Sequence, residues 1–112
     1  MKNKVNLPIP AVKALRKMGN EIRDARRRRR ITIKLMAERA GVSPKTIGKI
    51  ERGDPTTSIG GYASVLFVLG LAERLAGLVD PAHDLTGRRL DEEKLPQRVR
   101  IPGGSRRRGN RE

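Results

Sequence analysis

The sequence predicts an all-α protein, a compact five-helix domain with a flexible basic arm at each end. Three observations support this prediction. Apolar residues recur every three or four positions through the central part, no segment alternates convincingly as a strand would, and proline, glycine and basic residues gather towards the ends. We therefore divide the chain into an N-terminal arm (1–10), a helical domain (11–79) and a basic, largely disordered C-terminal tail (80–112).

The composition restricts the classes of partner and of chemistry. The formal net charge of +14 over 112 residues predicts affinity for a polyanion such as nucleic acid, an anionic membrane surface or an acidic protein. The absence of cysteine excludes disulfides and thiolate metal sites, and the one histidine, His83, lies in a polar stretch. No apolar run approaches about 18 residues, and no signal peptide is apparent.

The first helix is expected to begin at Pro10 or Ala11, because proline suits a first turn. It should end in the arginine run 26–30, whose charges complement the negative end of the helix dipole. Five successive residues of a helix advance by about 100° each, so at least one of these arginines must point back at the domain. The apolar stripe of this helix comprises Val12, Leu15, Met18, Ile22 and Ala25.

The next two helices have clear beginnings and ends. Thr32 is expected to cap a helix at 33–40, which Gly41 follows. Ser43 should cap a third helix, with Pro44 in its first position and Gly53 after its end. The residues predicted to face the core are Leu35, Met36, Ala37, Ala40, Val42, Ile47 and Ile50.

A fourth helix is expected at 59–70 after a Ser58 cap, and a short fifth helix at 71–79. The spacing of Tyr62, Val65, Leu66 and Leu69 is suited to packing. Tyr62 and Phe67 are the only aromatic residues, and both are expected in the core.

The second and third helices are joined by "AGVS" alone. Two short helices with a tight glycine turn match the helix-turn-helix motif, with small Ala37 at the helix crossing and Gly41 where the turn needs a positive φ. Val42, Ile47 and Ile50 are the apolar positions that would hold the second helix of the motif across the first. A plain two-helix hairpin in a small bundle is the alternative.

From about Gly19 to Val79, the chain resembles the Xre-type, phage-repressor-like helix-turn-helix domains. The resemblance rests on "GNEIRDAR", "ITIKLMAERAGVSPKTIGKIERG" and the two helices that follow. It implies a compact five-helix domain that binds DNA, usually as a dimer on a two-fold-related operator. It also implies a structural ion pair between Arg26 and Glu51.

The second helix of such a motif lies in the major groove, with its N-terminal residues towards the base edges. The candidate DNA-binding residues are Ser43, Pro44, Lys45, Thr46, Lys49 and Arg52. Lys45 and Lys49 share a helix face, whereas Arg52 lies late in the helix and is expected to contact the DNA backbone. Many relatives carry glutamine where this chain has Ile33, so one usual contact is not expected.

Gly48 lies in the middle of the third helix, where glycine costs about 0.5–1 kcal/mol relative to alanine. Its position on the outward side suggests that it lets the helix backbone approach DNA closely. The alternative is that an exposed site simply tolerates glycine.

These features predict a sequence-specific double-stranded DNA-binding transcriptional regulator, a repressor, that is cytoplasmic and nucleoid-associated. Small basic Xre-type proteins with apolar residues in a charged tail resemble antitoxins paired with HipA-type kinase toxins. That resemblance implies an autoregulating antitoxin of a toxin–antitoxin operon, a homodimer that binds the toxin through residues 80–112. The alternatives are a basic RNA-binding or ribosome-associated protein and an adaptor that neutralises a toxin without binding DNA. No enzyme, cofactor or metal site is expected.

Overall fold

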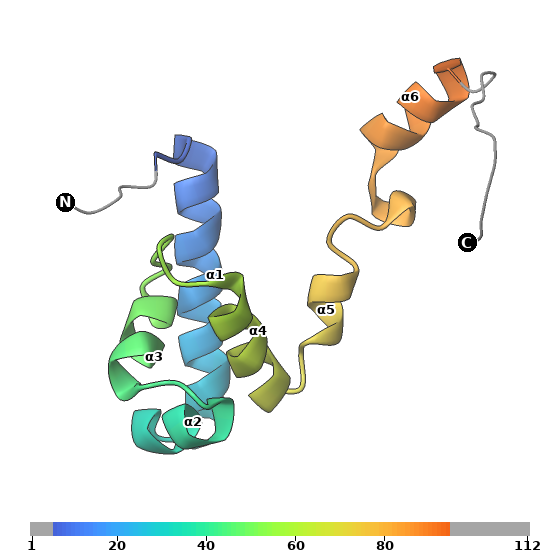
Figure 1. Ribbon diagram of the computed structural model, residues 1–112. Coiled ribbons are helices and arrows are strands. Elements are labelled where there is room, and N and C mark those ends of the chain that lie inside the picture. Colours follow the sequence, from blue (N-terminus) through green and yellow to red (C-terminus); the bar gives the residue numbers. More distant parts are fainter. Residues whose placement is uncertain (1–5, 95–112) are drawn as a thin grey trace, which may run out of the picture. The chain divides into compact units, whose positions relative to one another are not determined.

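The computed structural model describes residues 6–94, and these residues contain helices and no strand, as the all-α prediction requires. The chain divides into two units, Met1–Leu75 and Ala76–Glu112. Figure 1 shows the long α1 with α2, α3 and α4 gathered beside its C-terminal half. The elements in order are α1 (Ile9–Arg28), α2 (Ile33–Ala40), α3 (Pro44–Glu51), α4 (Ile59–Val68), α5 (Glu73–Ala76), the 3-10 helix η1 (Pro81–His83) and α6 (Leu85–Lys94).

Three helices begin with the predicted hydroxyl caps. The side-chain oxygens of Thr32, Ser43 and Ser58 each accept a hydrogen bond from the backbone N–H three residues later, at 3.0, 3.1 and 3.0 Å. Each cap satisfies one of the amides that a helix leaves without a partner in its first turn. The predicted starts of α2, α3 and α4 are therefore confirmed, while α1 begins at Ile9, slightly before the predicted Pro10 or Ala11.

The end of α1 is closed by a Schellman-type turn that contains an arginine in place of glycine. The amide of Ile31 donates to the Arg26 carbonyl at 3.2 Å, and the amide of Arg30 donates to the Arg27 carbonyl at 2.9 Å. Arg30 has a φ of 57°, the only positive value of a non-glycine residue in the part of the chain described. The left-handed conformation costs about 1–2 kcal/mol for such a residue, and burial of the following Ile31 offsets that cost.

The core of the first unit is built mainly from α2, α3 and α4, with Ile22 and Ala25 of α1. Burial of Ile47 and Ile50 in α3 is complete, as predicted, and Leu35 and Ala40 of α2 pack at its edge. The fully buried large side chains are Met36, Ile47, Ile50 and Val65.

The prediction that both aromatic residues lie in the core is wrong for Phe67. Tyr62 is 4% exposed, but Phe67 is 74% exposed. The buried side of α4 carries Tyr62, Val65 and Leu66, and each helical residue advances by about 100°. The residue after Leu66 is therefore turned away from the core, so α4 presents a phenyl ring to the solvent.

Two glycines let the backbones of α1 and α3 approach closely. A Cβ on Gly19 would lie 2.6 Å from the Ile50 carbonyl oxygen and 2.8 Å from that of Glu51. A Cβ on Gly53 would lie 2.5 Å from the Leu15 carbonyl oxygen, and Gly53 also has a φ of 73°. Since these neighbours are backbone atoms, they cannot move aside as a flexible side chain would.

The predicted fifth helix at 71–79 is shorter than expected, because only Glu73–Ala76 is helical. The tail (80–112) was predicted to be largely disordered, yet its described part contains η1 and α6. Asp80 and Asp84 cap these helices by accepting from the amides of Ala82 and Gly87, at 2.8 and 2.9 Å. The rest of the tail, 95–112, and residues 1–5 of the N-terminal arm lie outside the described residues.

None of the helices in residues 6–94 has the length and apolar character needed to cross a membrane.

The close contact of α1 and α3 predicts opposite effects for two identical substitutions. Gly19→Ala should lower the free energy of unfolding by about 1–3 kcal/mol or more, because its methyl group would collide with the backbone of α3. Gly60→Ala should raise it by about 0.4–1 kcal/mol, because that site is exposed and its nearest neighbour would be 3.7 Å away. Urea denaturation measures both, and equal effects would contradict the proposed contact.

Candidate nucleic-acid interface

The pair α2 and α3 has the geometry of a helix-turn-helix. Gly41 has a φ of 72°, and its amide and that of Val42 both donate to the Ala37 carbonyl, at 2.9 and 3.1 Å. This left-handed residue turns the chain sharply, so that Ser43 already caps α3. Ala37 is buried where α2 meets the other helices, and its small side chain permits the close crossing.

One face of α3 is directed outward and carries positive charge. Ile47, Ile50 and Glu51 form its buried side. Because each residue advances by about 100°, Lys45, Gly48, Lys49 and Arg52 fall within about 100° of arc on the opposite side. This set of four residues is called the outward face of α3 below.

The other predicted DNA-binding residues lie at the beginning of α3. Ser43 and Pro44 are exposed, while Thr46 is half-buried. The Ser43 hydroxyl accepts from the Thr46 amide at 3.1 Å and lies 2.9 Å from the Thr46 hydroxyl. Thr46 falls about 60° of arc beyond Lys49, so its side chain is at the edge of the outward face.

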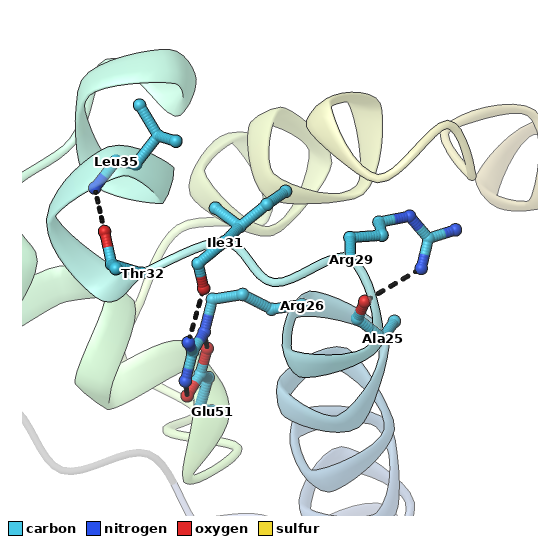
Figure 2. A network of polar contacts seen from close by, with 7 residues as sticks. All are labelled: Ala25, Arg26, Arg29, Ile31, Thr32, Leu35 and Glu51. Atoms are coloured by element: carbon cyan, nitrogen blue, oxygen red, sulfur yellow. Dashed lines mark hydrogen bonds and ion pairs between the residues drawn. The ribbon is translucent and has the colours of Figure 1, made fainter.

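A buried ion pair holds α3 against α1 (Figure 2). Arg26 Nε donates to Glu51 Oε2 at 2.6 Å, and Arg26 Nη2 donates to Glu51 Oε1 at 3.1 Å. The third nitrogen, Nη1, donates to the Ile31 carbonyl oxygen at 2.8 Å, between α1 and α2. The two side chains are only 8% and 7% exposed. The pair that the family resemblance implies is therefore present, and Arg26 is the inward-pointing arginine of the run.

The other arginines of the run are exposed and surround this end of α1. Arg29 folds back, and its Nη1 donates to the Ala25 carbonyl at 2.9 Å (Figure 2). Further exposed cations extend the basic surface along α1 and α2. They are Arg23, Arg27, Arg28, Arg30, Lys34 and Arg39.

The loop after α3 is held by the carboxylate and the carbonyl of Asp54. Hydrogen bonds from the Thr56 hydroxyl and amide, both at 2.7 Å, lower the pKa of Asp54, and the nearby charges of Lys49 and Arg52 lower it further. The buried Tyr62 donates its hydroxyl to the Asp54 carbonyl at 2.8 Å, and burial followed by the charge of Asp54 raises the pKa of Tyr62. Sequence reasoning did not identify this link between the loop and α4.

Breaking the buried ion pair should lower the free energy of unfolding far more than breaking an exposed ion pair. Glu51→Gln leaves the Arg26 guanidinium buried without its counter-charge, so we expect the free energy of unfolding to fall by about 3–5 kcal/mol. Glu21→Gln is the matched control, because Glu21 pairs with Lys17 at 2.7 Å on the surface, where such pairs contribute about 0.2–1 kcal/mol. Chemical denaturation of both variants checks the difference, and similar losses would show that the buried pair has no special role.

Comparison with known proteins agrees with this geometry. Residues 22–60 match the model of a protein family described as Helix-turn-helix. This segment begins within α1 and ends in the first turn of α4, so it contains the α2–α3 pair, the Arg26–Glu51 ion pair and the outward face of α3. No curated protein and no solved structure matches the chain. By both its sequence and its geometry, the pair of α2 and α3 within this segment is a helix-turn-helix.

Proposed function

We propose that this protein is a sequence-specific double-stranded DNA-binding transcription regulator that acts as a repressor, with α3 in the major groove. The observation that carries the proposal is the outward face of α3, where Lys45, Lys49 and Arg52 stand on a helix fixed by a buried ion pair. A helix fits the major groove, and basic side chains on it can donate to guanine O6 and N7.

The surroundings of α3 supply contacts that do not depend on sequence. The Lys45 amide, in the first turn of α3, can donate to a phosphate, and the exposed arginines of α1 can neutralise others. The net charge of +14 supports the same kind of partner. Phosphate contacts of this kind orient the domain, while the outward face of α3 distinguishes bases.

The alternative of a single-stranded RNA-binding protein has less support. Proteins that bind single strands stack bases on exposed aromatic rings within basic grooves. Phe67 is the one exposed aromatic residue in the described part of the chain, and it lies on α4, which contains no basic residue. A single exposed ring on a helix without basic residues does not form such a platform.

We further propose that two copies pair through the exposed side of α4. Among the described α-helices, only α4 contains no charged residue. Ile59 and Phe67, each 74% exposed, lie with Ala63 at four-residue intervals on one side of it. Because a strongly positive chain repels a second copy, an uncharged apolar helix is the surface on which two copies can meet. A two-fold dimer would present two copies of α3 to two half-sites.

The role of an antitoxin remains a prediction. The described part of the tail carries Leu85 and Leu90 on α6 with exposed apolar side chains, which could contact a partner protein. The partner implied by the resemblance is a kinase-type toxin. Co-purification with a kinase encoded beside the gene, lost on deletion of residues 80–112, is the expected result.

Substituting Lys45 should reduce sequence preference more than general affinity. We expect Lys45→Ala to lower affinity for the preferred site by about 1–3 kcal/mol and to leave binding to random duplex much less changed. Lys13→Ala, which removes an exposed charge from α1, is the control. Fluorescence anisotropy at several salt concentrations measures both, and proportional losses on the two DNAs would contradict the role of α3.

Substituting Phe67 should separate the proposed dimer. We expect Phe67→Ser to shift the protein from dimer to monomer in sedimentation experiments. It should also weaken binding to an operator with two half-sites, because the two copies of the protein would no longer bind the half-sites as one unit. Leu78→Ser is the matched control, since Leu78 is 70% exposed outside α4. A monomeric wild type, or an unchanged dimer in Phe67→Ser, would contradict the role of α4.

A further inference from the structure

We propose that Arg52 is a specificity-determining residue that donates to a guanine in the major groove, and that Gly48 positions it. The inference rests on the proposed function, since it requires α3 to lie in the groove. It differs from the sequence prediction, in which Arg52 contacts only the DNA backbone.

The Arg52 side chain folds back over α3. Arg52 is the cap residue at the C-terminal end of α3, one turn after Gly48. A Cβ on Gly48 would lie 3.3 Å from Arg52 Nη1. The guanidinium therefore lies against bare helix backbone at Gly48, near the middle of α3. This conformation carries the charge back along the helix, away from its end.

The same position lies on the helix face that would enter the groove. Arg52 falls between Gly48 and Lys45 around the helix axis, on the outward face of α3, and it is exposed. A guanidinium there is in line with the Lys45 and Lys49 side chains, which the proposed function directs at base edges. The location of the charge thus supports a contact with a base.

The hydrogen-bond donors of Arg52 are available. Two other arginines near this site use their donors within the protein, because Arg26 binds Glu51 and Arg29 binds the Ala25 carbonyl. Within residues 6–94, no acceptor binds the Arg52 side chain, and no carboxylate lies within 4.0 Å of it. The planar fork of an arginine donates to guanine O6 and N7 at once, which a lysine ammonium does less selectively.

This arrangement also explains why position 48 carries no long side chain. Glycine is among the least favourable residues in a helix interior, and Gly48 is half-buried beneath the Arg52 guanidinium. An alanine would displace the guanidinium by only a few tenths of an ångström. A long side chain at position 48 would instead occupy the place of the guanidinium and force it away from the outward face of α3.

The test is selection of preferred sites from a random duplex DNA library by the full-length protein and three variants. Arg52→Lys keeps the charge but removes the fork, Arg52→Ala removes both, and Gly48→Gln fills the space under the guanidinium. We expect the wild type to select a site containing a guanine that all three variants no longer prefer, with discrimination there falling about fivefold to a hundredfold. The base preferences at the other positions of the selected site should be unchanged, and thermal melting should show that the variants are folded.

The outcomes separate this inference from the function on which it rests. If the wild type selects no site, the proposed function fails. If the variants select the wild-type site and Arg52→Ala weakens all sequences alike, with a shallower salt dependence, Arg52 contacts phosphate and the inference is wrong. If only Gly48→Gln keeps the guanine preference, the positioning role of Gly48 is wrong.

Discussion

The arrangement of the first unit depends on the buried contact of Arg26 with Glu51. The arginine lies near the end of α1 and the glutamate near the end of α3, so one bidentate pair joins elements distant in sequence. Its third hydrogen bond, to the Ile31 carbonyl, also holds the segment that leads into α2. Buried charges are costly to desolvate, and this cost is offset here because each guanidinium nitrogen of Arg26 donates a hydrogen bond and both carboxylate oxygens of Glu51 accept one. The direction of α3, and hence of its outward face, follows from this contact.

Glycine residues allow α1 and α3 to lie close enough for the ion pair to form. Gly19 and Gly53 remove side chains where α1 meets the end of α3, so the backbones approach closely enough for Arg26 to contact Glu51. Gly41 turns the chain between α2 and α3. Arg30 serves a similar purpose at the end of α1, although its side chain makes the left-handed conformation unfavourable. The close-contact glycines, the left-handed residues and the buried ion pair therefore act together in positioning α1, α2 and α3.

Charge is distributed unevenly over this scaffold. Positive side chains occupy the exposed parts of α1, α2 and α3, whereas α4 has no charged residue and exposes Ile59 and Phe67. A positive surface strengthens binding to a polyanion, whereas an uncharged apolar surface favours a contact between two copies of the chain. The proposed contacts with DNA and with a second copy thus use different helices of one small domain.

The sequence by itself determined where α2, α3 and α4 begin and which of their residues form most of the core. Hydroxyl caps, an N-terminal proline and closing glycines act within a few residues, so Thr32, Ser43 and Ser58 were found without the structure. The contact of Arg26 with Glu51 came from resemblance, since no local signal joins residues so far apart. The exposure of Phe67 also followed from the helical period, because Phe67 lies about 100° beyond Leu66 and outside the apolar stripe of α4. Only the tertiary structure decided that Gly19 lies against the backbone of α3 and that Arg52 folds over Gly48. Each of these depends on how one helix is rotated and placed against another or on a side-chain torsion, and the helical period alone does not specify them.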